Sequence, residues 1–415
     1  MRTSMLFLAA GAAAALGACK WTEFDDLQNQ TWVGSTTKPS VQSSDYGVAI
    51  QRGAGLTSGG TLVVIGASQP TYSELAYDAQ GGAKLTANTL ELNSTYGIGQ
   101  LDAQPFLLAD PTTDEVALIV SGGSSQIAVL TGTDHLTLHN LFLTNNTTSP
   151  VDAATYMLPP GSVVEEPLVA SGDIVVGTFY GPVPNPQPTC KLVESAAPGA
   201  AAVAPRALGA VRGVGGTDDV LAWGATGTAP GKLYRYPGSA FNGCSASLPP
   251  TLSHDTGFVP GRGSQILSIG SSLVLLVGHH DNDDTSLLQV YDATTLTPVG
   301  GSVSLPKLRS AALYDDVPST DQYVIAGYPG EIVDGVTAGV VRMFKLSASG
   351  IEPQPAALFN DAQPDNNQSF GRAVAAMPFN GHTIVAVAAN NEIFMYFRLN
   401  LTDGTALYGE TRQGR

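Results

Sequence analysis

Residues 62–67 read LVVIGA, and this short apolar run, ending in a glycine and a small residue, recurs six more times with small variations. Each run is followed by a turn and by a second segment in which apolar and polar residues alternate. The seven runs are LVVIGA at 62–67, VALIVSG at 116–122, DIVVGT at 173–178, VLAWGA at 220–225, LVLLVG at 273–278, YVIAGY at 323–328 and IVAVAA at 384–389.

One marker residue can be taken from the end of each run: Gly66, Gly122, Gly177, Gly224, Gly278, Gly327 and Ala388. The markers are about 54 residues apart, and a period near 50 with several strands per unit is typical of propeller blades. Near-continuous apolar runs indicate inner strands buried on both faces, and the alternating partners indicate strands nearer to solvent. The pattern predicts an all-β, seven-bladed β-propeller over residues 44–400. Six or eight blades, or paired β-sandwiches, are the alternatives.

Composition agrees with a chain of many strands and turns. The 415 residues include 47 Gly and 27 Pro, and 43% of them are hydrophobic, which excludes global disorder and argues against a helical bundle. Charged residues make up only 13%, yet the net charge is -16. A basic nucleic-acid-binding surface is therefore not expected, and no nucleic-acid partner is predicted.

The N-terminus has the layout of a secretory signal, in which Arg2 precedes an apolar run from residue 5 to residue 16. The tetrad Leu16-Gly17-Ala18-Cys19 that follows resembles the lipobox of bacterial lipoproteins. This resemblance implies a signal peptide over 1–18, a lipidated Cys19 and membrane attachment through that lipid. Because Lys20 rather than Asp follows the cysteine, the resemblance favours the outer membrane or cell surface of a bacterial envelope.

Two segments flank the repeats. Residues 19–43 carry Cys19 and form a tether, although the portion FDDLQNQTWVG can instead add a strand that closes the last blade. Residues 401–415 are expected to form a C-terminal tail. In an exported protein whose Cys19 takes the lipid, Cys190 and Cys244 remain as a pair that can form a disulfide. Two separate buried thiols are the alternative.

Three repeats also carry an aromatic-Gly pair before the apolar run, namely Tyr46-Gly47, Tyr96-Gly97 and Phe370-Gly371. Together with the downstream Gly-Ala, these pairs resemble the FG-GAP repeat of integrin alpha-chain propellers and related bacterial surface proteins. The resemblance implies seven blades and a calcium loop between the first two strands of a blade, with its first Asp twelve residues before the marker. Asp110 and Asp315 stand at that distance.

The candidate calcium ligands are Asp110, Thr112 and Asp114 of the second repeat, but Leu118 stands where an acidic ninth ligand is needed. The loop after Asp315 has Tyr323 at that place, so no cofactor is expected and calcium is the weaker alternative. The run His279-His280-Asp281-Asn282-Asp283-Asp284 is interpreted as a hairpin turn rather than a transition-metal site.

Catalytic motifs such as G-x-S-x-G, H-E-x-x-H and G-x-x-x-x-G-K-[ST] do not occur in the sequence, and an enzyme is not expected. The leading hypothesis is a lipid-anchored extracytoplasmic propeller that binds a protein or glycan at the envelope as a binding or adhesion module. One alternative is a periplasm-facing scaffold subunit of an envelope assembly. Another is a propeller hydrolase or lyase acting on polysaccharide, with carboxylates gathered from several blades.

Overall fold

The structure is a computed structural model of the 415-residue chain. It describes residues 32–37, 45–53, 61–66, 70–77, 83–92, 105–109, 116–122, 126–132, 137–142, 151–158, 166–177, 189–212, 217–226, 230–241, 247–280, 285–315, 321–361, 364–379, 382–390, 392–397 and 407–409.

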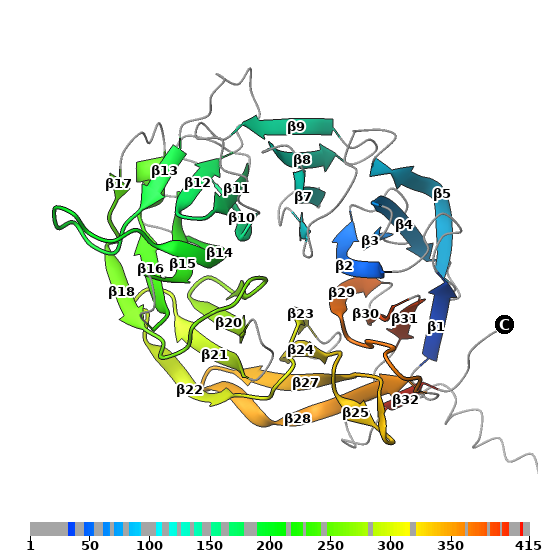
Figure 1. Ribbon diagram of the computed structural model, residues 1–415. Helices are drawn as coiled ribbons and strands as arrows, with labels where there is room; N and C mark the ends of the chain where they lie inside the picture. Colours follow the sequence, from blue (N-terminus) through cyan, green and yellow to red (C-terminus); the bar gives the residue numbers. More distant parts are fainter. Residues whose placement is uncertain are drawn as a thin grey trace, which may run out of the picture.

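Within these residues the strands form seven sheets of four or five strands and one separate hairpin (Figure 1). The first sheet contains β2 (Tyr46–Gly53), β3 (Thr61–Gly66), β4 (Thr71–Tyr77) and β5 (Ala83–Glu91). The second contains β6 (Phe106–Ala109), β7 (Val116–Gly122), β8 (Gln126–Gly132) and β9 (Thr137–Phe142). The third contains β10 (Ala153–Met157), β11 (Glu166–Ser171), β12 (Ile174–Gly177), β13 (Thr189–Leu192) and β17 (Ser247–Leu248).

The remaining sheets follow the same order from inside to outside. The fourth contains β14 (Ala204–Arg212), β15 (Asp218–Ala225), β16 (Lys232–Tyr236) and β18 (Leu252–Asp255), with the 3-10 helix η1 (Gly238–Phe241) after β16. The fifth contains β19 (Gln265–Ile269), β20 (Leu273–His279), β21 (Ser286–Asp292) and β22 (Pro298–Val303). The sixth contains β23 (Ser310–Asp315), β24 (Gln322–Tyr328), β27 (Val340–Ser347), β28 (Gly350–Asp361) and β32 (Leu407–Gly409). The seventh contains β29 (Ala373–Phe379), β30 (His382–Ala388), β31 (Glu392–Phe397) and β1 (Trp32–Thr37).

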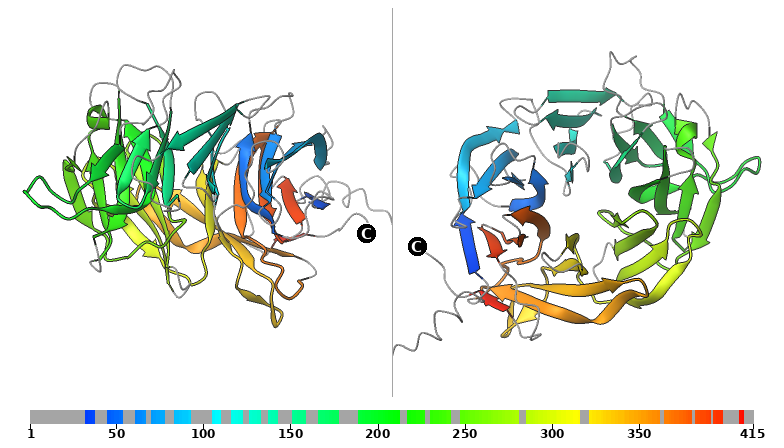
Figure 2. Two further views of the ribbon diagram at one scale, coloured as in Figure 1. Left: turned by 45° about the horizontal axis from the view of Figure 1, so that its top comes forward. Right: turned by 180° about the vertical axis from the view of Figure 1, so that it is seen from behind.

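The first strand of each sheet lies nearest the centre, and the sheets are arranged around it (Figures 1 and 2). Each first strand lies beside the first strands of the two neighbouring sheets. The neighbouring pairs are β2–β6, β6–β10, β10–β14, β14–β19, β19–β23, β23–β29 and β29–β2. The seven first strands therefore follow one another in a ring.

Three strands connect distant parts of the chain. β1 pairs antiparallel with β31, with Trp32 opposite Phe397 and Thr37 opposite Glu392, so an N-terminal strand is the outer strand of the C-terminal sheet. β32 pairs parallel with β28, and β17 pairs parallel with β13 of the preceding sheet. β1 lies within the 19–43 segment for which the sequence left both a tether and a closing strand open.

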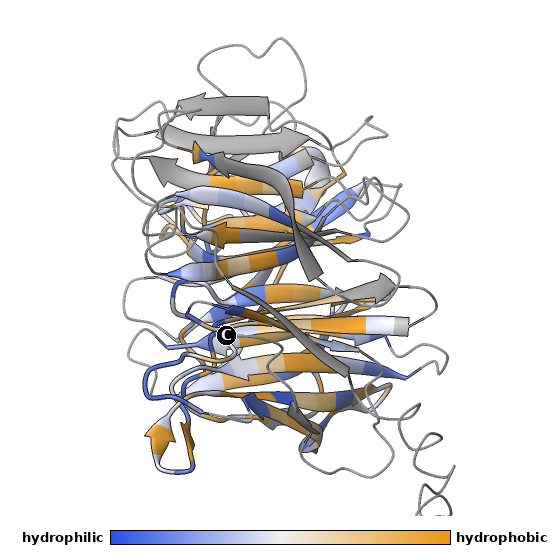
Figure 3. Cartoon of the chain, turned by 90° about the vertical axis from the view of Figure 1, so that its right-hand side faces the viewer, coloured by the Kyte–Doolittle hydropathy of each residue, from blue (hydrophilic) through white to orange (hydrophobic). Residues whose placement is uncertain are grey.

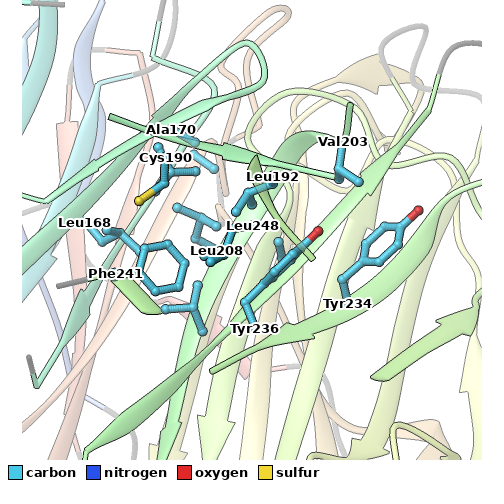
Figure 4. Close-up of a cluster of buried hydrophobic side chains, with 14 of the residues drawn as sticks. Leu168, Ala170, Cys190, Leu192, Val203, Leu208, Tyr234, Tyr236, Phe241 and Leu248 are labelled. Atoms are coloured by element: carbon cyan, nitrogen blue, oxygen red, sulfur yellow. The ribbon is translucent and has the colours of Figure 1, made fainter. Parts of the chain in front are cut away.

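The hydrophobic core is divided into layers, each between two neighbouring sheets. One layer joins the third and fourth sheets, and Figure 4 shows its side chains meeting between them. Its labelled members are Leu168, Ala170, Cys190, Leu192, Val203, Leu208, Tyr234, Tyr236, Phe241 and Leu248. Figure 3 shows apolar stretches inside many strands and polar residues at many of their ends.

The structure refines the position of the apolar runs within the sheets. They were predicted to be inner strands, and six of them are second strands, each preceded by a further strand nearer the centre. In the third sheet the run DIVVGT forms β12, which is the third strand. The reason is that second and third strands are both covered on two faces by neighbouring sheets, so a continuous apolar run does not distinguish them from the innermost strand.

Candidate functional site

The candidate site is the end of the ring at which the first strands begin. Ser310, the first residue of β23, donates from its hydroxyl to the carbonyl oxygen of Gly371, which directly precedes the β29 region (2.9 Å). Arg372 in turn donates to Asp45, which precedes β2, at 3.4 Å. The starts of β23, β29 and β2 therefore lie together on one end.

The starts of β10, β14 and β19 meet in the same way. Arg206 in β14 forms an ion pair with Asp152, which precedes β10. Arg262, just before β19, donates from Nε and Nη2 to the carbonyl oxygen of Val151 at 3.2 and 3.0 Å. Arg262 thus reaches from the fifth sheet to the third, past the start of the fourth.

We call this set of residues the basic rim: Arg206, Arg262, Arg309 and Arg372, with the two carboxylates Asp45 and Asp152. The four arginines come from consecutive sheets, the fourth to the seventh. The side chains of Arg206 and Arg372 are 37% and 20% exposed. Burial lowers the pKa of Arg372 from its usual value, and the neighbouring carboxylate of Asp45 acts in the opposite direction. The rim gathers four guanidinium groups and two carboxylates in a chain whose net charge is -16.

The opposite end of the ring, where the first strands finish, has a different balance of charge. Among the described residues there, Arg212 pairs with Asp218, Arg235 with Asp219 and Lys345 with Asp321. Asp292 and Asp315 add two further carboxylates at the ends of β21 and β23. Among these described groups, five carboxylates stand beside three cations.

A hairpin between β24 and β27 projects from the ring (Figures 1 and 3). It consists of β25 (Ile332–Val333) and β26 (Val336–Thr337), joined by Asp334 and Gly335, whose φ angles of 50° and 86° suit a two-residue turn. Ile332 is 64% exposed, more than the other exposed large apolar residues of the described chain, Leu252 and Val259.

The base of the hairpin is held by several contacts. Arg342 forms a two-pronged ion pair with Glu331, and its guanidinium carbon lies 5.0 Å from the centre of the buried Tyr328 ring. The Glu331 side chain raises the pKa of Arg342 through hydrogen bonds, while burial raises that of Tyr328. Lys307, two residues before Arg309, donates to the carbonyl oxygen of Gly330 at 2.5 Å. This contact joins the rim to the hairpin.

Most predicted site residues lie outside the described part of the chain. Cys19, Cys244, Asp110, Thr112 and Asp114 all do so, and the structure adds only that β6 ends at residue 109 and β7 begins at residue 116. Cys190 is buried in β13 and is disulfide-bonded. Because its partner is not among the described residues, the Cys190–Cys244 pairing stays a prediction.

The other motifs have structural surroundings. Asp315 accepts a hydrogen bond from Gln322 at 2.9 Å, and Tyr323 is buried in β24 with its ring against Tyr314. His279 is buried at the end of β20, and the His280 backbone N–H donates to Thr285 at 3.1 Å across the connection to β21. No group of three His, Cys, Asp or Glu residues suited to a metal occurs in the described ranges.

Sequence reasoning missed the basic rim, although a signal is present. Arg206 and Arg309 each stand eighteen residues before a marker glycine, at 224 and 327. Arg262 and Arg372 each stand sixteen residues before the next markers, at 278 and 388. An arginine at nearly constant distance from the repeat marker in four successive repeats predicts one arginine per sheet at one end of the ring.

Comparisons with known proteins support the fold alone. No family model matches the chain, and no curated protein matches it. Among solved structures, the chain is similar to BBS1N in its crystal structure in complex with ARL6DN, soaked with lead. The TM-score is 0.56 at 11% sequence identity, and the match covers 91% of this chain and 100% of BBS1N.

The likeness shows that the chain has an all-β, propeller-like fold. The likeness does not test whether the chain has FG-GAP repeats or is a lipoprotein. In the described residues, no helix is long and apolar enough to cross a membrane.

Proposed function

We propose that this chain is a lipid-anchored, seven-bladed propeller that binds a protein partner at the bacterial cell envelope. The seven sheets would be the blades, and β1 would close the ring by completing the blade that contains β29–β31. The observation that carries the proposal is the hairpin β25–β26, which presents the exposed Ile332 on a base held by the ion pair of Arg342 with Glu331. A two-stranded hairpin is only marginally stable by itself. The contacts at its base hold it in one conformation before binding, which lowers the cost of binding and favours a role in recognition.

Further support comes from the fold and from the N-terminal sequence. BBS1N, which is similar in fold, is in complex with a protein in its structure. The lipobox-like residues 16–19 place the lipid on Cys19, and β1 begins at Trp32. The twelve residues between them reach at most about 40 Å when fully extended, which would hold the ring close to the membrane. FG-GAP-like calcium binding is not needed for this function, and no catalytic activity is proposed.

The experiment is site-specific photo-crosslinking in intact cells. A photo-reactive amino acid at position 332 is expected to capture a discrete envelope protein. The same amino acid at position 352, an exposed residue of β28 toward the opposite end, serves as the matched control and should capture none. Equal capture at both positions, or no capture at position 332, would contradict the proposal.

The anchor and the orientation need separate measurements. Metabolic labelling with palmitate should mark the protein and should be lost in Cys19→Ala. A membrane-impermeant label applied to intact cells should modify the ring. Failure of that label, with palmitate still incorporated, would favour the periplasm-facing scaffold over the surface-exposed binding module.

A further inference from the structure

We propose that Asn367 is the acceptor of an N-linked glycan, a modification that rests on the export of the chain proposed above. Residues 365–369 read Asp-Asn-Asn-Gln-Ser, and the triplet from Asn367 to Ser369 has the form Asn-X-Ser, which receives sugars in exported proteins. Five other triplets of the form Asn-X-Ser or Asn-X-Thr start at residues outside the described part of the chain, namely Asn29, Asn93, Asn145, Asn146 and Asn400. Asn367 is therefore the acceptor whose surroundings the structure describes.

Asn367 stands at the tip of a tight turn between β28 and β29. The backbone N–H of Gln368 donates to the carbonyl oxygen of Asp365 at 3.3 Å, so Asn366 and Asn367 are the two central residues of the turn. The φ angle of Asn367 is 61°, and the second central residue of a type II turn needs such a positive value, which asparagine tolerates better than most residues. Both central residues are exposed. The turn therefore presents Asn367 at the surface.

The backbone of Asn367 is held by the fold, but its side-chain amide is not used. Its N–H donates to the carbonyl oxygen of Thr337 at 2.8 Å, and its own carbonyl oxygen accepts from Nδ2 of Asn390 at 2.5 Å. Phe370, three residues further on, is fully buried and anchors the end of the segment. No described residue forms a hydrogen bond with the side-chain amide of Asn367. A bulky polar group on Nδ2 can therefore extend into solvent without breaking a contact of the fold.

The donor for such a transfer is a sugar carried on a polyprenyl diphosphate. Nδ2 of Asn367 attacks the anomeric carbon of the sugar, and the new N–C bond forms as the C–O bond to the diphosphate breaks. The polyprenyl diphosphate leaves with the bonding electron pair, and one proton passes from Nδ2 to a base of the transferase. The Ser369 hydroxyl completes the triplet that the transferase binds. Because hydrogen bonds hold the turn in the folded ring, we expect the transfer to precede folding of this segment.

The acceptor lies beside the hairpin β25–β26. Thr337 of β26 donates from its backbone N–H to Oδ1 of Asn366 at 3.4 Å and accepts at its carbonyl oxygen from Asn367. Ile332 of β25 pairs with the same Thr337 in the hairpin. A modified chain would therefore present an apolar side chain and a sugar on one surface.

The test is mass spectrometry of the full-length protein, purified in mild detergent from the envelope of cells that produce it. Cleavage after Lys345 and Arg372 yields the peptide 346–372, which contains no other Lys or Arg before its last residue and no other acceptor triplet. In the unaltered protein this peptide is expected to carry the added mass of whole sugar residues, and fragmentation should locate that mass on Asn367.

Three variants define the acceptor. Asn367→Asp keeps a residue that tolerates a positive φ but removes the amide, and it should abolish the added mass. Ser369→Ala removes the hydroxyl of the triplet and should abolish it as well. The matched control is Asn366→Asp, which changes the neighbouring exposed asparagine and leaves the triplet intact, so the added mass should remain.

Two results would overturn the proposal. These are an unmodified mass for peptide 346–372 of the unaltered protein, and an added sugar mass that persists in Asn367→Asp or Ser369→Ala. Palmitate labelling of the same sample reports the anchor separately. A palmitate-labelled protein without sugar would remove this inference and leave the anchored module, whereas a protein with sugar on Asn367 and without palmitate would keep the inference and remove the anchor.

Discussion

Gly327 and Gly371 come from neighbouring sheets and pack against each other through their backbones. A Cβ on Gly327 would lie 2.0 Å from the carbonyl oxygen of Gly371. Gly47, in the left-handed region with φ of 78°, lies in the same way against Ala388, and its added Cβ would be 2.8 Å from the Ala388 Cβ. The aromatic-Gly pair of one repeat therefore meets the marker of the preceding repeat, which gives both short motifs a physical reason.

Gly327→Ala is expected to destabilise the protein by about 2–4 kcal/mol, because the new methyl group meets backbone that cannot move aside cheaply. The matched control is Gly301→Ala in β22, where an added Cβ meets nothing within 4 Å. That change should alter stability by less than about 1 kcal/mol. Urea unfolding measures both variants, and equal midpoints would contradict the close contact at Gly327.

Asp292 closes the turn between β21 and β22. Its Oδ1 accepts from the backbone N–H groups of Thr295 and Thr294 at 2.9 and 2.7 Å, and these bonds hold the pKa of Asp292 below its usual value. Because the pKa of Asp292 is lower in the folded state, its ionised carboxylate stabilises the fold at pH values above the unfolded-state pKa, which is near 3.9. This stabilisation is lost as the pH falls through the folded-state pKa.

Asp292→Asn is therefore expected to lower stability at pH 7 by about 0.5–1 kcal/mol, as befits exposed hydrogen bonds. The difference between the variant and the unaltered protein should shrink once the pH falls below about 3.9. Thermal unfolding across a pH series measures this difference. A difference that is constant down to strongly acidic pH would show that the charge of Asp292 does not matter.

At the scale of the elements, the sequence predicts second and third strands well and first strands poorly. Val116–Gly122 and Leu273–His279 are continuous apolar runs that pack on both faces, so their pattern is plain. β14 reads APRALGAVR, with a bulge between Pro205 and Ala207 and alternating burial, and resembles a loop or an outer strand. In the third sheet the tight turn at Gly172 joins β11 to β12, which shifted the expected strand order by one.

The candidate site was hidden for a different reason. The arginines of the basic rim are about 50 residues apart in the sequence, so none of them shows a local pattern by itself. Their nearly constant distance from the repeat markers points to one end of the ring only once the first strands are known to run parallel to one another. The hairpin β25–β26 likewise resembles an ordinary turn, since the contacts of Glu331 with Arg342 that fix it cannot be inferred from Val-Asp-Gly-Val.

Replacing residues 332–337 by two glycines is expected to leave the melting temperature within about 2 °C, because the hairpin buries little of the core. The same variant should lose the partner captured from position 332, tested with the photo-reactive group at the exposed position 366, which lies beside Thr337 of the hairpin. Arg342→Met is the companion variant. It removes the Glu331 ion pair and the charge over Tyr328, and should lower stability by about 1–3 kcal/mol while the hairpin residues remain. If the two-glycine variant melts at as low a temperature as Arg342→Met, the hairpin itself stabilises the ring and does not serve for binding alone.

For the whole molecule, stability is distributed between sheets rather than held in one centre. The described apolar clusters lie between neighbouring sheets, as in the layer that joins Phe344 and Tyr328 of the sixth sheet to Leu288 of the fifth. Polar contacts reinforce the same junctions, including Arg235 to the carbonyl oxygen of Ala293 and Tyr236 to that of Val193. A ring built in this way loses stability wherever one sheet is incomplete, and β1 completes the sheet that joins the two ends of the chain.

Deleting residues 20–37, which removes β1, is therefore expected to lower the melting temperature by roughly 5 °C or more. It leaves the edge of β31 without its six paired residues and exposes that edge to other chains. Deleting only residues 20–31 is the matched control, because it keeps Trp32–Thr37 and should melt like the unaltered protein. Thermal unfolding and light scattering measure the two deletions. Since Glu392–Phe397 would offer a template for strand addition, the longer deletion should also self-associate, and a monomer with unchanged melting temperature would show that the ring does not depend on β1.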